Sequence, residues 1–136
     1  MGDPSFDFAA PERDPMAMIL VVEDDAFIRE IAEVTIQDLH HQILSAADVP
    51  EALAILRSDI GIDALFTDIY LKRRMNGGCE VAHEAARLRP QCRVLYTSGN
   101  RLTASMTQSF LPGSEFLPKP YTALQLEASI SHILAR

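Results

Sequence analysis

The stretch Met18-Ile19-Leu20-Val21-Val22-Glu23-Asp24-Asp25 is an apolar run that stops at three acids. Three later apolar runs also end on polar groups: Phe66-Thr67-Asp68, Tyr96-Thr97-Ser98-Gly99 and Phe116-Leu117-Pro118-Lys119-Pro120. Continuous apolar runs are typical of buried parallel strands. In an open parallel α/β sheet, such strand ends meet in one crevice where the strand order reverses. The sequence therefore predicts one pocket with carboxylates, a hydroxyl and an ammonium, a set suited to a divalent cation and a phosphoryl group.

The rest of the chain alternates short strands with helices, which predicts a parallel sheet covered on both faces. We expect a disordered lead-in over residues 1–16, which are rich in proline and charge, and one domain over residues 17–136. The expected strands are 18–22, 42–46, 64–67, 94–97 and 115–117. The expected helices are 26–39, one capped by Asp48, 79–89, 101–110 and 121–134. In the first helix, Phe27, Ile31, Val34 and Leu39 are predicted to share the apolar face.

Length and charge exclude several classes of function. At 136 residues the chain fits one domain, and its net charge of -7 disfavours both nucleic acid and anionic membranes as direct partners. Its apolar runs are too short to span a bilayer, and the first residues lack the features of a secretory signal. We therefore expect a cytoplasmic protein. Cys79 and Cys92 are too few and too isolated for a disulfide framework or a zinc site.

The acids after the first strand are followed by four further motifs: Thr67-Asp68-Ile69, Met75-Asn76-Gly77-Gly78, Thr97-Ser98-Gly99 and Lys119-Pro120. With these motifs in this order, the chain resembles the receiver domain of two-component response regulators. The resemblance runs from about residue 18 to residue 135. It implies a doubly wound, flavodoxin-like α/β fold with five helices and a five-stranded parallel sheet in the order 2-1-3-4-5. It also implies a phosphoprotein of a two-component system or phosphorelay.

Asp68 is the predicted phosphoacceptor, because an aspartate carboxylate can attack phosphorus and form an acyl phosphate. The resemblance implies that the donor is a phosphohistidine on a histidine kinase or a histidine phosphotransfer protein. It further implies a Mg²⁺ site in which Asp24 and Asp68 bind directly, Glu23 binds through water and Tyr70 supplies its backbone carbonyl. Asp25 is interpreted as the N-terminal acid of the following helix rather than a ligand.

Lys119 is the predicted base, pairing with Asp68 at rest and with a phosphoryl oxygen afterwards. The resemblance implies a cis peptide between Lys119 and Pro120. Ser98 is the predicted switch hydroxyl, with Thr97 as the alternative. Phe116 matches the switch aromatic that changes the surface of the fourth helix, fifth strand and fifth helix, where a downstream protein would bind. A permanently buried core ring is the other interpretation of this residue.

The loop after Asp68 departs from the family pattern. It is slightly longer than usual and lacks the proline that the family commonly has near Lys72. The basic run Lys72-Arg73-Arg74 is either a solvated loop or an element that steers an acidic partner or a phosphate. The bulky Tyr70, two residues after the acceptor, is expected to obstruct the water that hydrolyses the acyl phosphate.

Two main functions compete for this sequence. The first is a stand-alone receiver, not an enzyme with an output domain, since only one helix fits after Lys119; autophosphatase activity is its only expected catalysis. The second is a receiver-like interaction module that works without phosphorylation. An aspartate-based phosphatase would need a second acid at Tyr70, and a flavin-binding protein would need a phosphate-binding loop where Glu23 and Asp24 stand.

Overall fold

A computed structural model of the chain describes residues 16–136. The lead-in predicted for residues 1–16 therefore lies outside the described residues except for Met16, whose side chain is exposed. No helix in the described part of the chain is long and apolar enough to cross a membrane. The cytoplasmic location stays a prediction.

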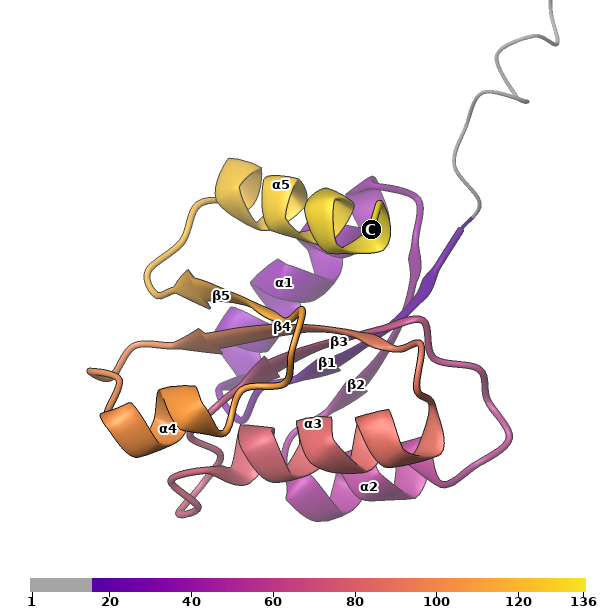
Figure 1. Cartoon of the computed structure of the whole chain (residues 1–136). Helices are drawn as coiled ribbons and strands as arrows, with labels where there is room; N and C mark the ends of the chain where they lie inside the picture. Colours follow the sequence, from indigo (N-terminus) through magenta and orange to yellow (C-terminus); the bar gives the residue numbers. More distant parts are fainter. Residues whose placement is uncertain (1–15) are drawn as a thin grey trace, which may run out of the picture.

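The described residues form a three-layer α/β sandwich around a parallel sheet with the predicted strand order, β2-β1-β3-β4-β5. The strands are β1 (Met18–Val22), β2 (Gln42–Ala46), β3 (Ala64–Asp68), β4 (Arg93–Ser98) and β5 (Glu115–Pro118). The helices are α1 (Ala26–Asp38), α2 (Val49–Leu56), α3 (Gly77–Leu88), α4 (Ala104–Gln108) and α5 (Ala123–Leu134). Helices α1 and α5 cover one face of the sheet, and α2, α3 and α4 lie on the other (Figure 1). The predicted fold class is confirmed.

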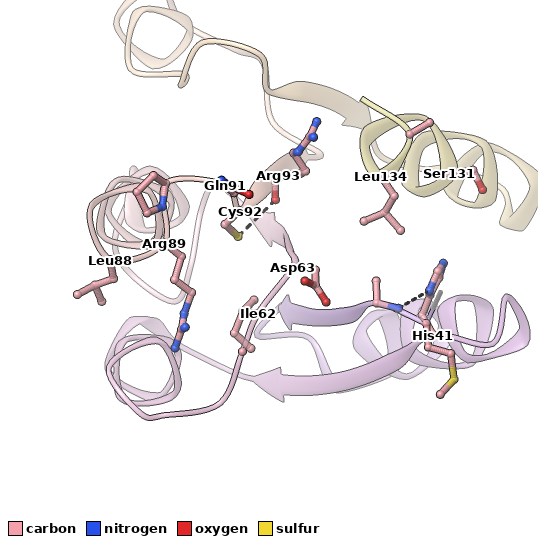
Figure 2. A pocket seen from close by; sticks show the side chains of 15 residues that line it. His41, Ile62, Asp63, Leu88, Arg89, Gln91, Cys92, Arg93, Ser131 and Leu134 are labelled. Atoms are coloured by element: carbon pink, nitrogen blue, oxygen red, sulfur yellow. Dashed lines mark hydrogen bonds between the residues drawn. The ribbon is translucent and has the colours of Figure 1, made fainter. Parts of the chain in front are cut away.

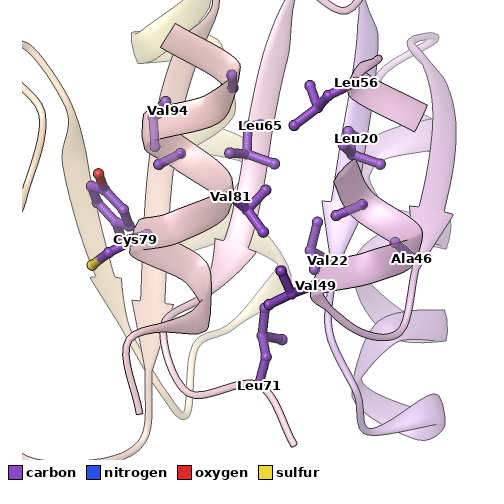
Figure 3. Close-up of a cluster of buried hydrophobic side chains, with 14 of the residues drawn as sticks. Leu20, Val22, Ala46, Val49, Leu56, Leu65, Leu71, Cys79, Val81 and Val94 are labelled. Atoms are coloured by element: carbon purple, nitrogen blue, oxygen red, sulfur yellow. The ribbon is translucent and has the colours of Figure 1, made fainter. Parts of the chain in front are cut away.

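Alternation along the strands divides the core between the two faces of the sheet. On β1, Leu20 and Val22 belong to the cluster under α2 and α3, whereas Ile19 and Val21 belong to the cluster under α1 and α5. Figure 3 shows the first cluster, in which Leu20, Leu65 and the helix side chains are fully buried. Strand β3 is buried along its whole length because it lies between two strands and two helical layers. Three of the four apolar runs, in β1, β3 and β4, therefore form the centre of the sheet, and the fourth forms the edge strand β5.

The apolar face predicted for α1 is wrong for three of its four residues, since only Leu39 packs, half-buried, against the core. Phe27, Ile31 and Val34 are 72%, 44% and 50% exposed. The side chains that α1 buries are Ala32, Thr35 and Ile36. Apolar residues occupy more than one stripe of this helix, and periodicity alone does not say which stripe faces the sheet. Ala32 and Ile36 belong to the buried cluster that contains Ile19 and Val21 of β1, so their stripe is the one that faces the sheet.

The predicted ends of the elements differ from the observed ends by a few residues, and for α4 and α5 capping explains where the helix begins. Helix α4 is shorter than expected because Thr103 caps it, its hydroxyl accepting a hydrogen bond from the Met106 amide at 3.2 Å. Asp48 caps α2 as predicted, with Oδ1 accepting from the Glu51 amide at 2.9 Å. Helix α5 begins at Ala123 after a Thr122 cap rather than at residue 121.

Candidate functional site

Three carboxylates from two neighbouring strands converge at the C-terminal edge of the sheet. Glu23 and Asp24 follow β1, and Asp68 is the last residue of β3. The two strands are paired side by side, with Val22 opposite Thr67. One oxygen from each carboxylate lies within 4.8 Å of the others, which is the spacing of a cation site. The strand order also reverses here. The chain first passes from β1 to β2 on one side and then crosses to β3 on the other side of β1, as expected for a doubly wound sheet.

Lys119, which directly follows β5, brings a cation to this cluster. Its Nζ lies 2.8 Å from Oδ2 of Asp68 and 2.7 Å from Oε1 of Glu23. The peptide bond between Lys119 and Pro120 is cis, as the resemblance implied. The backbone amide of Lys119 donates to the Ser98 carbonyl at 3.0 Å, which fixes the residue at the end of β4. The structure thus joins side chains from β1, β3 and β5 that lie far apart in the sequence.

Burial and charge set the protonation of this group. Burial and, to a smaller extent, the neighbouring Asp68 raise the pKa of Glu23 to about 7, against the hydrogen bond from Lys119, which lowers it. Burial disfavours the charged ammonium of Lys119, but its hydrogen bonds to Asp68 and Glu23 outweigh this effect and raise its pKa. Unit charges about 4 Å apart interact by roughly 4 kcal/mol at an effective dielectric near 20. The carboxylates therefore favour a nearby cation.

Asp24 and Asp25 are adjacent, but only Asp24 belongs to the cluster. Asp25 is the N-cap of α1, where its Oδ1 accepts from the amides of Phe27 and Ile28 at 2.9 and 3.0 Å. The interpretation of Asp25 as a helix N-terminal acid agrees with this geometry. Asp24 instead accepts a hydrogen bond through Oδ2 from the Lys72 amide at 2.8 Å. The two acids therefore have different positions and different partners.

The backbone of Lys72 explains why the family's proline would not fit at this residue. Its φ is 54°, in the left-handed region, whereas proline fixes φ near −65°. Proline would also remove the N–H that holds Asp24. The sequence alone gave no sign of this hydrogen bond, because the two residues are 48 positions apart.

Gly78 packs directly against the backbone of the acceptor Asp68, a role that the sequence did not indicate. A Cβ at this position would lie 2.0 Å from the carbonyl oxygen of Asp68 and 2.8 Å from the Cα of Ile69. The Gly78 amide donates to the Ile69 carbonyl at 2.8 Å. The start of α3 therefore contacts the end of β3 directly, and only glycine permits this approach.

Both candidate switch hydroxyls are buried at the end of β4. The hydroxyl of Ser98 accepts from the Asn100 amide at 3.0 Å, whereas the Thr97 hydroxyl has no hydrogen-bond partner among the described residues. Phe116 is half-buried, and its ring lies 6.1 Å from that of Phe110. Phe110 in turn stacks on Tyr96 at 4.3 Å. The choice between Ser98 and Thr97, and the movement of Phe116, remain predictions.

Tyr70 lies at the rim of the carboxylate cluster. Its amide donates to Oδ1 of Asp68 at 3.3 Å, and its side chain is 38% exposed. The metal-binding role of its carbonyl and the obstruction of water by its ring remain predictions.

A broad cavity of about 1020 Å³ lies away from this cluster. Figure 2 shows its lining, which includes Asp63, Arg89, Arg93 and His41. Asp63 precedes β3 and Arg93 begins β4, so the cavity lies at the N-terminal edge of the sheet. Because the carboxylates and Lys119 meet at the opposite edge, the chemistry is assigned there and not to this cavity.

The fold and the site together define a class: a flavodoxin-like α/β protein with a carboxylate pocket and a lysine at the switch point. Residues 19–131 match the response regulator receiver domain family. The chain therefore belongs to this family of two-component signalling domains. Receiver domains bind Mg²⁺ in an acidic pocket and accept phosphoryl groups from histidine kinases or phosphotransfer proteins.

Individual relatives agree with this assignment. A response regulator receiver protein from Sinorhizobium medicae WSM419 is 28% identical, with a TM-score of 0.81 over 88% of this chain and 95% of that one. A CheY-like receiver domain protein from Methanospirillum hungatei JF-1 shares the fold, with 23% identity and a TM-score of 0.80 over 89% and 95% of the two chains. The probable transcriptional regulator ycf27 of Porphyridium aerugineum is 27% identical over 118 residues, 87% of this chain and 48% of that protein. The chain spans about half the length of the curated relatives it matches.

Proposed function

We propose that this receiver accepts a phosphoryl group on Asp68 from a phosphohistidine of a histidine kinase or histidine phosphotransfer protein. The observation that carries the proposal is the position of Asp68, within reach of two other carboxylates and 2.8 Å from the ammonium of Lys119. Asp68 is only 6% exposed, and its two carboxylate oxygens are held by the Tyr70 amide and the Lys119 ammonium.

The donor set of the pocket fits Mg²⁺, which prefers oxygen ligands. Asp24 and Asp68 would hold the ion directly, Glu23 through water, and Tyr70 through its backbone carbonyl. The bound ion would neutralise the negative charge that gathers when a phosphoryl group meets three carboxylates.

In the transfer step, a carboxylate oxygen of Asp68 attacks phosphorus and forms a new P–O bond. The P–N bond to the donor imidazole breaks, and its electron pair stays with the imidazole, which takes up a proton. Lys119 moves from Asp68 to a phosphoryl oxygen and so keeps a charge-assisted hydrogen bond throughout. Water that later attacks the acyl phosphate would return Asp68 and release inorganic phosphate.

Phosphorylation would then be transmitted by two residues beside the site. The Ser98 hydroxyl would leave the Asn100 amide and donate to the phosphoryl group, with Thr97 as the alternative. Phe116 would move into the space that is vacated. The surface formed by α4, β5 and α5 would change and bind a downstream protein, as expected for a local charge event that biases two packings.

Incubation with acetyl phosphate and Mg²⁺, followed by intact-mass measurement, tests the proposal. We expect the mass of one phosphoryl group to be added to the wild type, to be absent from Asp68→Asn, and to disappear when EDTA removes Mg²⁺. Asp59→Asn is the matched control, since Asp59 is exposed and lies outside the cluster. A folded wild type that gains no phosphoryl group would instead support the phosphorylation-independent interaction module.

A further inference from the structure

The basic run after Asp68 forms a tight turn at the mouth of the pocket. Leu71 and Arg74 bridge each other in antiparallel fashion, with N–H···O distances of 3.1 and 2.9 Å. Leu71 is fully buried and anchors the turn, which leaves Lys72 and Arg73 at its exposed tip.

This tip is attached to the site itself. The Lys72 amide lies 2.8 Å from Oδ2 of Asp24, a member of the carboxylate cluster. The charges of side chains at this tip lie within about one Debye length of the pocket, roughly 10 Å at 0.1 M salt. Salt therefore screens their attraction for an anion in the pocket only in part.

The two tip side chains carry charge that nothing in the described part of the chain neutralises. Neither Lys72 nor Arg73 makes a side-chain hydrogen bond or ion pair within residues 16–136, whereas Arg74 is paired with Glu80 at 2.9 Å. The protein as a whole has a net charge of -7, and its pocket gathers three carboxylates against one lysine. The carboxylates of the pocket therefore repel an approaching phosphoryl dianion, whereas the two cations at this turn attract it.

We propose that Lys72 and Arg73 steer the anionic phosphoryl group of the donor into the pocket, and so determine which donors react quickly. This inference rests on the proposed phosphorylation of Asp68. The attraction acts on the charge of the phosphoryl group, whether a phosphohistidine protein or a small acyl phosphate carries it. With acetyl phosphate, Asp68 attacks phosphorus, the P–O bond to the acetyl group breaks, and acetate leaves with the electron pair.

The test compares the initial phosphorylation rates of the wild type and Lys72→Gln/Arg73→Gln with acetyl phosphate, a dianion, and phosphoramidate, a monoanion. Steering by oriented charge changes association rates by about 10-fold or more at low ionic strength. We expect the double variant to be about tenfold slower with acetyl phosphate at low salt, less affected with phosphoramidate, and nearly equal to wild type at high salt.

Arg57→Gln/Arg87→Gln is the control. It removes the same charge from two exposed residues at the C-terminal ends of α2 and α3, on the opposite edge of the sheet, where both pair with Glu84 at 3.0 and 2.9 Å. We expect it to react like the wild type. A tip variant as fast as wild type at every salt concentration, or one slowed equally at low and high salt, overturns the steering role while leaving the phosphorylation of Asp68 intact. A wild type that accepts no phosphoryl group overturns both proposals.

Discussion

Replacing Gly78 with alanine tests whether the start of α3 sets the position of Asp68. The new Cβ would meet the Asp68 carbonyl oxygen at 2.0 Å and its carbonyl carbon at 2.8 Å. Both are backbone atoms of a buried central strand, so relief requires β3 or α3 to move. Overpacking of this kind costs about 3 kcal/mol, and alanine regains at most about 1 kcal/mol of helix propensity.

The net destabilisation is therefore about 2 kcal/mol. At roughly 3–5 °C per kcal/mol for a domain of this size, Tm should fall by about 6–10 °C. Because the displaced atoms belong to the acceptor, the rate of phosphorylation by acetyl phosphate should also fall. Thermal unfolding by circular dichroism and intact-mass kinetics measure the two effects.

Gly61→Ala is the matched control, because a Cβ there meets nothing within 4 Å. We expect it to be neutral or slightly stabilising, by less than about 1 kcal/mol. Gly77→Ala should fall between the two, since its Cβ would meet Val49 Cγ2 and the Cβ atoms of Leu71 and Arg74 at 3.0–3.2 Å, a much smaller overlap than at Gly78. A Gly78→Ala protein as stable and as reactive as Gly61→Ala would refute the reasoning.

Three further predictions concern other parts of the molecule. Ile36→Ala should cost about 2–5 kcal/mol in chemical unfolding, whereas Phe27→Ala should cost less than about 0.5 kcal/mol, because only Ile36 is buried. The pKa of Glu23 rises from its usual 4.5 to about 7 in the fold, so the folded state holds an extra proton between these values. Stability should therefore decrease as pH rises from about 4.5 to 7, by up to about 3 kcal/mol, and Glu23→Gln should flatten this slope in urea titrations at several pH values. Tyr70→Asn should speed the loss of phosphate from Asp68 several-fold by opening a path for water, as followed by the decay of phosphoprotein mass.

Each of these has a result that contradicts it. Equal costs for Ile36→Ala and Phe27→Ala would mean that α1 buries the other stripe. If Glu23→Gln keeps the wild-type dependence of unfolding free energy on pH, that dependence comes from another titratable group. An unchanged phosphoprotein lifetime in Tyr70→Asn would reject the obstruction of water, and Tyr70→Phe, which keeps the bulk, is its control.

The strand pattern was sufficient to predict the sheet and the edge at which the site lies. Runs such as Ala64–Asp68 are apolar throughout because a central parallel strand is buried on both faces, and that requirement is visible in the residues themselves. The acids after β1 and the lysine after β5 could be brought together on this basis, since parallel strand ends share an edge. The orientation of α1 could not be predicted in this way, because it depends on which side chains pack against the sheet rather than on how many are apolar.

The sequence by itself determined the fold class, the strand order through its family resemblance, and the set of polar side chains at the strand ends. This was possible because burial of a strand requires a run of apolar residues, and the end of a strand is a local change from apolar to polar residues. Only the tertiary structure decided that Lys72 holds Asp24, that Gly78 contacts the acceptor strand, and that Lys119 pairs with Glu23 as well as with Asp68. Each of these contacts joins separate segments at distances of a few ångströms, and such distances depend on how all the layers pack together.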